Sequence, residues 1–251
     1  MPRERLFPDG SLEIVLQLDA DYRPALDGPS EPFPVLSVGG IRTASHTIEN
    51  SGRPVRVLGI GLWPAGAYAL LRTSLRELTD LDLDLHDVIG RAAAEFGTLC
   101  WDAHGDAACV GAAVEWMRAR IGRAPEPAAL VARTLAQIEA DGGDLLIAAL
   151  DGFDGKAGGR FAAAFRDQVG VTPKRFARIV RFRRALELVR HGEASLAEIA
   201  GRTGYYDQPH MNAEFRVHAG MSPQAFRRAV HYPNSVSLAE QNLQDEVATS
   251  A

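Results

Sequence analysis

A chain of 251 residues is long enough for one large or two ordinary domains, each with its own core, and we expect two. Hydrophobic residues make up 46% of the sequence and charged residues 24%, which is typical of a globular protein. No apolar stretch approaches the roughly 18 residues that would span a bilayer, and the first ten residues lack the apolar segment of a signal peptide. We therefore expect a cytoplasmic protein with no membrane partner.

The net charge of −5 is unevenly divided along the chain. Residues 160–228 hold thirteen Lys or Arg and six Asp or Glu, a local charge of +7, so the remainder carries −12. A basic C-terminal module on an acidic chain is typical of a nucleic-acid binder. The alternative, in which the charges only solvate helix faces, stays open.

The first part of the chain predicts a β-rich domain. Short apolar or alternating runs broken by Pro and Gly are typical of strands, and they occur at residues 11–18, 33–41, 43–49 and 54–62. After these runs the apolar spacing becomes helical, at residues 65–78 and 106–121, with an acidic loop leading into a helix at 80–96. The Pro-containing segment 120–130 predicts a linker to the second domain.

The two cysteines of the chain, Cys100 and Cys109, have His104 between them. A closed zinc site needs about four ligands, and the CxxC spacing of such sites is absent. We therefore expect two reduced thiols packed beside helices.

Two further patterns could be mistaken for metal sites. Asp80, Asp82 and Asp84 alternate as in calcium loops, but the turn glycine and the final glutamate are missing, so we expect a loop before a helix. His46 is the only histidine among the predicted strands, whereas a metal-dependent enzyme needs several imidazoles and a carboxylate that converge. The sequence therefore predicts no metal, no cofactor and no enzymatic activity.

A repeat with a period of 50 residues occupies the basic segment. In each copy a Phe-Arg pair ends a helix, Gly is its left-handed C-cap, and Thr or Ser followed by Pro begins the next helix. One structural unit therefore occurs twice. The identical pairs are Phe165/Phe215, Arg166/Arg216, Gly170/Gly220, Pro173/Pro223, Phe176/Phe226 and Arg178/Arg228.

A short helix is predicted before each of these helices, at residues 144–152 and 195–204, and Ser195 with Glu198 forms a capping box in the second. Short helix, turn and helix thus occur twice, and residues 173–191 form one long helix between the copies. At 1.5 Å per residue this helix is roughly 28 Å long, which can hold two recognition helices close to one DNA turn, about 34 Å, apart. The spacing predicts a reader of the major groove.

At these residues the chain resembles the AraC/XylS family of bacterial transcription regulators, whose DNA-binding domain has two helix-turn-helix units joined by a long helix. The resemblance is carried by "FRDQVGVTPKRFARIVRFRRALELV" and "SLAEIAGRTGYYDQPHMNAEFRVHAGMSPQAFRR", about a quarter of the chain. It implies a sequence-specific DNA-binding transcription factor whose partner is double-stranded DNA. It leaves a contact with RNA polymerase and a homodimer open.

The N-terminal half resembles the partly cupin-like sensor domain of some of these regulators through "LFPDGSLEIVLQL", "VLGIGLWPAG" and "ELTDLDLDL". Such sensors have further residues before the "PDG" segment, so we expect the leading strand to be missing here. With the predicted linker and the polar composition of the last residues, we expect an α+β protein with three parts. They are a β-rich sensor domain with trailing helices at 1–122, an all-α double helix-turn-helix domain at 123–232 and a polar tail at 233–251.

The positions that face outward from each second helix follow from the buried ones, because a helix advances about 100° per residue. Phe161 and Phe165 define the buried side of the first copy, and Met211 and Phe215 that of the second. Family members usually place Arg, Gln or an aromatic residue outward, and each lost bidentate base contact forgoes roughly 1–3 kcal/mol of discrimination. The outward residues here are Gly159, Ala163, Pro209 and Ala213.

Two interpretations remain open. In the first, arginines hold phosphates while a few residues of the second copy contact bases, which gives a salt-sensitive binder of modest specificity. In the second, the protein is a degenerate family relative that acts as a ligand sensor or protein partner without sequence-specific DNA binding. The predicted DNA contacts are Arg160, Arg166, Arg178, Gln208, His210, Asn212 and Arg216.

Control by a small-molecule effector is implied by the family resemblance and by no residue pattern of this chain. A pocket for such an effector is expected among the strands. The candidate ligand-binding residues are Arg42, His46, Arg56 and Trp63.

Overall fold

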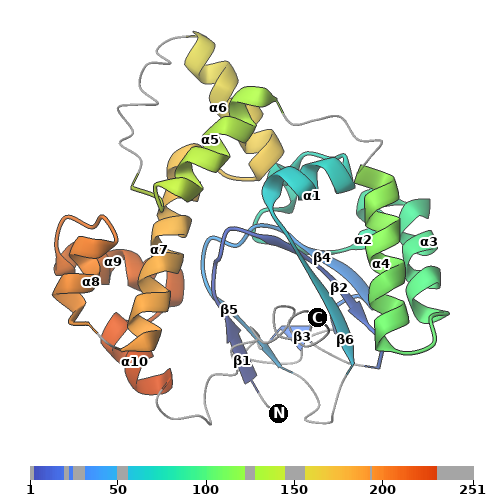
Figure 1. Cartoon of the computed structure of the whole chain (residues 1–251), viewed down its shortest axis with the longest axis horizontal. Coiled ribbons are helices and arrows are strands. Elements are labelled where there is room, and N and C mark those ends of the chain that lie inside the picture. The colour runs from blue at the N-terminus through green and yellow to red at the C-terminus, as the bar shows by residue number, and fades with distance from the viewer. Residues whose placement is uncertain are drawn as a thin grey trace, which may run out of the picture.

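The computed structural model of the chain describes residues 3–19, 23–24, 32–49, 56–121, 128–144, 156–192 and 194–230. A β-rich N-terminal half lies against a helical C-terminal half (Figure 1). The predicted α+β fold class is confirmed. The predicted boundary between residues 122 and 123, the predicted helix at 144–152 and the polar tail fall in residues that are wholly or largely outside this description.

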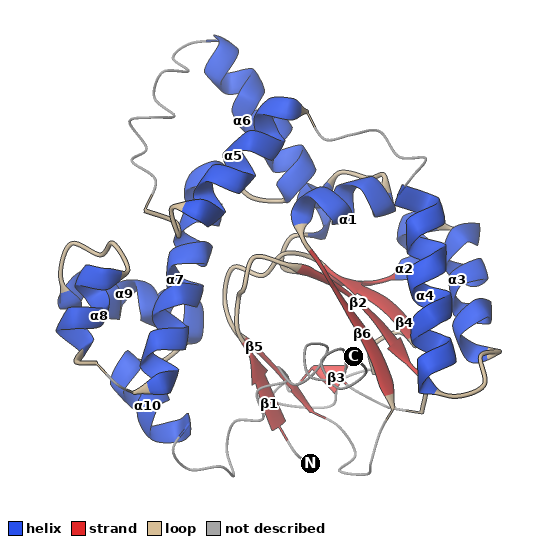
Figure 2. Ribbon diagram, viewed as in Figure 1, coloured by secondary structure: helices blue, strands red, loops and turns tan. Residues whose placement is uncertain are grey.

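Two antiparallel sheets form the N-terminal half (Figure 2). One has the strand order β6-β2-β4-β7 and the other the order β1-β5-β3. The strands are β1 Arg3–Leu6, β2 Leu12–Gln17, β3 Arg23–Pro24, β4 Leu36–Gly39, β5 His46–Glu49, β6 Val57–Leu62 and β7 Asp82–Asp84.

The two faces of the four-stranded sheet differ in character. On the central strand β2, Leu12, Ile14 and Leu16 are buried, because alternate side chains share one face and this face packs against the helices that follow. The opposite face carries Glu13, which lies in register with Gly39 of β4 and Gly61 of β6. One face of the sheet is therefore core, and the other combines polar side chains with bare glycines.

Helices cover the apolar face of this sheet and form all the described part of the C-terminal half (Figure 1). No helix of the described ranges is long and apolar enough to cross a membrane. The helices are α1 Pro64–Leu71, α2 Leu85–Ile89, α3 Arg91–Trp101, α4 Asp106–Ile121, α5 Ala129–Ala140, α6 Lys156–Val169, α7 Pro173–His191, α8 Leu196–Arg202, α9 Gln208–Ala219 and α10 Pro223–Val230, with a 3-10 turn, η1, at Leu75–Leu78.

Three expectations for the N-terminal half were wrong. A leading strand is present, because Arg3–Leu6 pairs with His46–Glu49 as β1. The helix expected at 65–78 ends at Leu71, where Arg72 turns left-handed with φ 57°. Asp82–Asp84 form the edge strand β7, which pairs with β4, and only the last of these aspartates also caps a helix, α2.

The buried side chains of the described residues form two apolar clusters that meet along α7. The first joins the sheet and α1–α4 to α5, α6 and the N-terminal part of α7, up to Val180. The second begins at Phe182 and joins the rest of α7 to α8, α9 and α10. The linking helix, which runs from Pro173 to His191 as predicted, therefore contributes to both cores.

Candidate nucleic-acid interface

The caps predicted from the repeat are present in both copies. Gly170 and Gly220 adopt left-handed backbone angles, φ 97° and 69°, at the ends of α6 and α9. Thr172 accepts a hydrogen bond from the Arg175 N–H at the start of α7, and Ser222 does the same at α10. The capping box of α8 is also formed, so the local chemistry of the repeat sets the helix boundaries.

Helix α6 presents the outward face that the sequence predicts. Phe161 and Phe165 are buried, with exposed fractions of 9% and 0%. Gly159 and Ala163 are exposed on the other side. Arg160 and Arg166 are exposed as well, and no ion pair of either is present among the described residues.

The N-cap of α9 is Asp207, whose carboxylate accepts a 2.7 Å hydrogen bond from the His210 N–H. The ring of His210 packs edge-on against Tyr205 with 5.4 Å between ring centroids, and its Nδ1 faces the Tyr206 N–H at 3.4 Å. The His210 ring is therefore held beside the turn.

The remaining predicted contacts of α9 differ in exposure. Arg216 is exposed beside the outward residues Pro209 and Ala213, whereas Gln208 and Asn212 are half-buried at the flanks. The Asn212 Oδ1 atom is buried and has no hydrogen-bond partner among the described residues. The outward face of α9 thus carries one strong hydrogen-bond donor, Arg216, between small side chains.

Many of the basic residues of α7 are engaged inside the protein. Arg178, a predicted phosphate contact, forms a two-point ion pair with Glu214 of α9, at 2.8 and 2.6 Å. Arg181 donates to the Gly143 carbonyl at 2.6 Å and covers the Tyr205 ring. The charge surplus of this segment therefore packs α7 against its neighbours as well as facing solvent.

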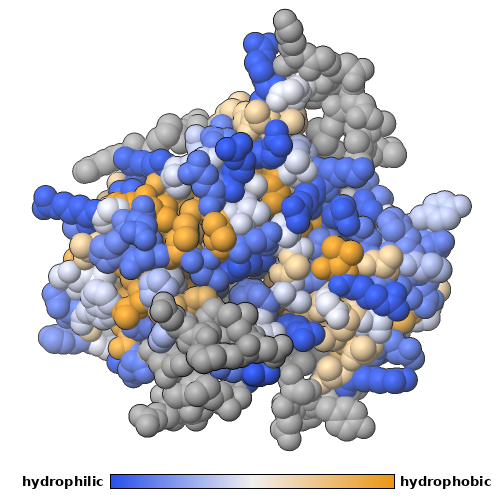
Figure 3. All heavy atoms as spheres, turned by 180° about the vertical axis from the view of Figure 1, so that it is seen from behind, coloured by the Kyte–Doolittle hydropathy of each residue, from blue (hydrophilic) through white to orange (hydrophobic). Residues whose placement is uncertain are grey.

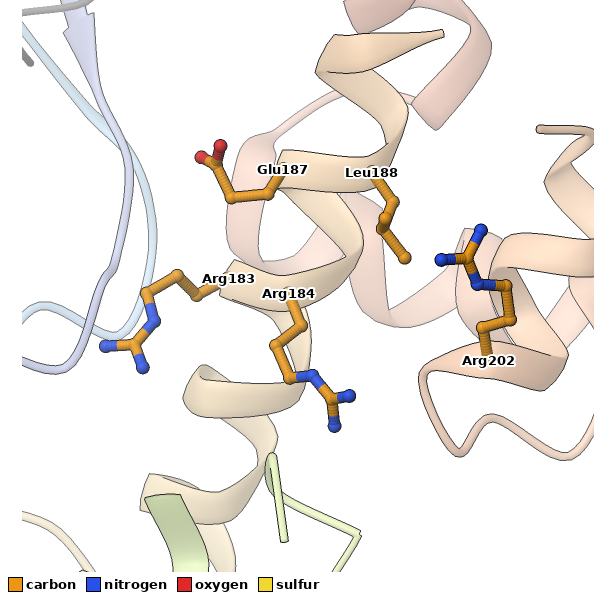
Figure 4. Close-up of a pocket in the computed structure, with 5 residues that line it drawn as sticks. All are labelled: Arg183, Arg184, Glu187, Leu188 and Arg202. Carbon is orange, nitrogen blue, oxygen red and sulfur yellow. The ribbon is translucent and has the colours of Figure 1, made fainter. Parts of the chain in front are cut away.

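An open groove of about 370 Å³ lies beside α7 and α8 (Figure 4). Arg183 points toward the β-rich half and pairs with Glu139 at 2.6 Å. Arg184 and Arg202 face the open space on either side of Leu188. Arg184 and Arg202 were not among the predicted contacts. Their guanidinium groups have the chemistry to hold an anion such as a phosphate, although the carboxylate of Glu187 also lines the groove.

Tyr206 is the other residue that the predicted set leaves out. It lies in the turn before α9, and 92% of its surface is exposed. A tyrosine this exposed beside the first turn of a recognition helix is placed to contact a backbone or a base. Its neighbour Tyr205 is buried, with 5% of its surface exposed, and nothing in the sequence distinguishes the two rings.

The structure does not gather the four candidate ligand residues into one site. Arg42 pairs with Asp82, and it lies near enough to His46 to lower the pKa of that imidazole, although burial lowers it more. Arg56 and Trp63 flank strand β6 at opposite ends, roughly 20 Å apart at 3.3 Å per residue. Arg56 pairs with Asp106, and the Trp63 ring lies 5.0 Å from the guanidinium of Arg183.

Glu13 joins Arg42 and His46 on the polar side of the sheet. Its carboxylate lies over Gly59, where an added Cβ would be 2.9 Å from Oε1. The Glu13 side chain is exposed, yet enough protein surrounds the carboxylate to raise its pKa, and the charges of Asp9 and Asp82 raise it further. The alternation of side chains along β2 predicts that Glu13 lies on the face opposite the core. Which residues surround its carboxylate depends on the register of the sheet, which the sequence does not show.

Cys100 and Cys109 are free and buried, as expected of packed thiols. Burial raises the pKa of Cys100 to about 12, and the nearby Cys109 raises it in the same direction. A thiol with so high a pKa is a poor nucleophile and metal ligand. No group of three or more His, Cys, Asp or Glu that could hold a metal occurs within the described part of the chain.

Comparisons with known proteins place the repeat in a family. Residues 158–229 match the model of a helix-turn-helix domain, and residues 2–84 match a domain of unknown function, DUF6597. The chain is 40% identical over 63 residues to the HTH-type transcriptional activator RhaS of Escherichia coli O139:H28, a match that covers 25% of this chain and 23% of RhaS. The chain thus aligns with about a quarter of the length of the curated relatives it matches.

The solved structures that match share less sequence with this chain. ToxT from Vibrio cholerae is 10% identical over 90% of this chain and 96% of its own, with a TM-score of 0.45. The C-terminal domain of AraT, a response regulator from Geobacillus stearothermophilus, is 20% identical over 49% of this chain and 99% of its own, with a TM-score of 0.38.

The duplicated caps, the shared linking helix and the two equivalent second helices show a repeated unit, and α8 with α9 forms a helix-turn-helix in the second copy. The helix-turn-helix domain of the chain is of the AraC type.

Proposed function

We propose that this protein is a transcription regulator that binds duplex DNA through α6 and α9, with phosphate contacts that dominate over base contacts. The observation that carries the proposal is the pair of equivalent recognition helices joined by the 19 residues of α7. The small outward residues of both helices support weak base readout, because Gly, Ala and Pro offer no side-chain hydrogen bond to a base.

The predicted contacts divide into two groups under this proposal. Arg160, Arg166 and Arg216 are exposed, so they are the phosphate contacts that we propose. Gln208 and His210 lie at the first turn of α9, where side chains of a recognition helix meet base edges. Arg178 remains a proposed contact that must share its guanidinium with Glu214.

A fluorescence-anisotropy titration of the full chain against its own upstream DNA and a scrambled duplex, at several salt concentrations, tests the proposal. The double variant Arg160→Ala/Arg216→Ala should reduce the slope of log affinity against log salt by roughly 2, since each phosphate contact contributes about 0.9. Arg118→Ala removes a charge from α4 that is also exposed, and it should leave the slope unchanged. An equal reduction of the slope in both variants would mean that the titration reports net charge alone.

The second candidate function is that of a degenerate relative that senses a ligand or binds a protein partner. The engagement of Arg178, Arg181 and Arg183 in intrachain contacts favours it, because these guanidinium groups are not all available to DNA. Absence of binding to any duplex at low salt would support this candidate and reject the first.

We further propose that an effector binds on the polar face of the four-stranded sheet, beside Arg42, His46 and Glu13. No atom lies within 4 Å of the place where a Cβ at Gly61 would stand, which leaves room there for a small polar molecule, whereas the space over Gly39 is taken by Asp82 and Arg42. A thermal-shift screen of small polar metabolites tests this, with Arg42→Met expected to abolish any shift and Arg118→Met to retain it. A homodimer and a contact with RNA polymerase stay predictions.

A further inference from the structure

The loop between β4 and β5, residues 40–45, contacts the C-terminal ends of both recognition helices. These ends are equivalent in the repeat, since Gly170 caps α6 and Gly220 caps α9. We call residues 40–45 the β4–β5 loop. It belongs to the N-terminal half, whereas both caps belong to the helix-turn-helix domain.

The end of α6 rests on the loop through its cap. A Cβ added at Gly170 would lie 2.8 Å from Ile41 Cγ2, so the loop packs directly against this glycine. Thr79, the residue after η1, donates its Oγ1 hydroxyl to the Gly170 carbonyl at 2.9 Å. The carbonyl at the end of α6 is thus satisfied by the N-terminal half.

The end of α9 is held through His218, by one hydrogen bond of its side chain and one of its backbone carbonyl. His218 Nδ1 donates to the Thr43 carbonyl at 2.8 Å, and the Ser45 N–H donates to the His218 carbonyl at 2.6 Å. Because a carbonyl only accepts, Nδ1 of the buried His218 carries the proton. Ser45 Oγ also lies 3.6 Å from the position of a Cβ at Gly220.

Thr43 links the loop to α7 and to Asp80. Its Oγ1 accepts a 2.8 Å hydrogen bond from Arg175 of α7 and donates at 2.6 Å to Asp80. Its N–H donates to the other carboxylate oxygen of Asp80 at 2.7 Å. Asp80 adopts φ 60°, which is uncommon for a residue other than glycine, and Thr43 is 5% exposed.

The other end of the loop has no room to move. The Gly40 N–H donates to the Leu81 carbonyl at 2.9 Å, and a Cβ at Gly40 would lie 1.7 Å from the Leu78 carbonyl oxygen. The loop is therefore braced against residues 78–82 on one side while it holds two helix ends on the other.

We propose that the β4–β5 loop is a clamp that fixes the orientation of α9 relative to α6, with Thr43 as its positioning residue. Arg42, the proposed effector contact, is the residue before Thr43 and is paired with Asp82. A change at Arg42 therefore reaches both recognition helices through one short segment. The effect of the clamp on DNA binding rests on the proposed function, whereas the clamp itself does not.

Hydrogen–deuterium exchange of the full chain without DNA tests the clamp. Thr43→Val keeps the shape of the side chain and removes the two hydrogen bonds of its hydroxyl, to Arg175 and to Asp80, while the backbone N–H still donates to Asp80. The amides of 166–170 and of 216–220 should then exchange about tenfold faster, and together, because both ends lose the same support. Thr43→Ser keeps the hydroxyl and should exchange like the unchanged protein.

The matched control is Thr47→Val, the same change on strand β5, where the described residues show no hydrogen bond from Thr47 to the helical half. It should leave both segments unchanged. If Thr43→Val does not fold, the substitution Arg175→Met tests the same contact. It removes the hydrogen bond from Arg175 to the Thr43 hydroxyl and should accelerate amide exchange in both segments to a smaller extent. Faster exchange at only one helix end, at neither, or equally over the whole chain overturns the clamp.

The proposed function is tested separately on the same proteins. Coupled exchange with no binding to any duplex would retain the clamp and reject the DNA-binding function. Binding to duplexes with unchanged exchange in Thr43→Val would retain the function and reject the clamp.

Discussion

Arg178 of α7 and Glu214 of α9 meet through two hydrogen-bonded ion-pair contacts, Nε to Oε2 at 2.8 Å and Nη2 to Oε1 at 2.6 Å. Both oxygens of the carboxylate are thereby used, and 13% of the Glu214 side chain remains exposed. A planar guanidinium suits this two-point geometry better than an ammonium group. The pair joins the linking helix to the second recognition helix.

Arg178→Ala should lower the free energy of unfolding by about 1–2 kcal/mol, since it leaves the mostly buried carboxylate of Glu214 without its partner. The partial exposure of Arg178 keeps the loss below that of a fully buried pair. Urea unfolding followed by circular dichroism measures it.

The double variant Arg178→Ala/Glu214→Gln is the control for this pair. It should recover part of the lost stability, because the orphaned charge is gone. A single variant as stable as the unchanged protein would show that the pair contributes nothing and that Arg178 is available to phosphate.

Asp207→Ala should destabilise the protein by about 1 kcal/mol, because the N–H of His210 loses its cap acceptor at the start of α9. Asp207→Asn retains a side-chain oxygen and should remain within a few tenths of a kcal/mol of the unchanged protein. Thermal and urea unfolding of the three proteins measure this difference. Equal losses in both variants would place the effect in the charge of Asp207 and not in capping.

Much of the helical half could be predicted from the sequence because its determinants are local. Thr172, Ser195 and Ser222 cap helices through residues three positions away, and Phe165 and Phe215 are buried as the helical period requires. These features need no knowledge of distant parts of the chain.

The remaining features depend on contacts between distant residues. Asp82 belongs to a strand only because β4 offers it a pairing edge. Arg56 and Trp63 are both candidate ligand residues in the sequence, which does not show that they lie at opposite ends of β6. The sequence also counted Arg178 as a surface charge, since its partner Glu214 lies 36 positions away. Local patterns cannot show which charges meet in the folded chain.

Apolar surface is also distributed in a way that the sequence did not show. The large exposed apolar side chains include Leu99 and Trp101 of α3 and Val110 and Ile121 of α4. The face opposite to that of Figure 1 shows larger apolar patches on the side of the molecule that carries α2–α4 (Figure 3). The acidic half therefore has an apolar side of its own, separate from the recognition helices.

Ala213→Arg should increase affinity for duplex DNA about tenfold, because Ala213 faces outward from α9 and an arginine there adds a contact to a base or phosphate. Anisotropy with two unrelated duplexes measures it: a gain on both would indicate a phosphate contact, and a gain on one a base contact. Ala225→Arg places the same charge on the exposed side of α10 as a control. An equal gain in affinity from Ala225→Arg would mean that the location of Ala213 on α9 does not matter.

Stability should fall as the pH is lowered through the range where His218 titrates. Burial lowers the pKa of His218 below its ordinary value of 6.5, and this outweighs the hydrogen bond to Thr43 and the nearby Glu214, which act in the opposite direction. Arg178 and Arg175 lower the pKa further. In the unfolded chain the imidazole therefore takes up a proton at a higher pH than in the folded protein, which favours unfolding as the pH drops.

His218→Gln keeps a donor for the Thr43 carbonyl and removes the titration. The difference in unfolding free energy between the unchanged protein and this variant should be constant above the ordinary pKa and should shrink as the pH falls below it, which urea unfolding between about pH 8 and about pH 5.5 measures. His46, whose pKa burial also lowers, contributes equally to both proteins and cancels. A difference that stays the same across this range would show that His218 does not titrate on unfolding, and so that the link between Thr43 and α9 is insensitive to acid.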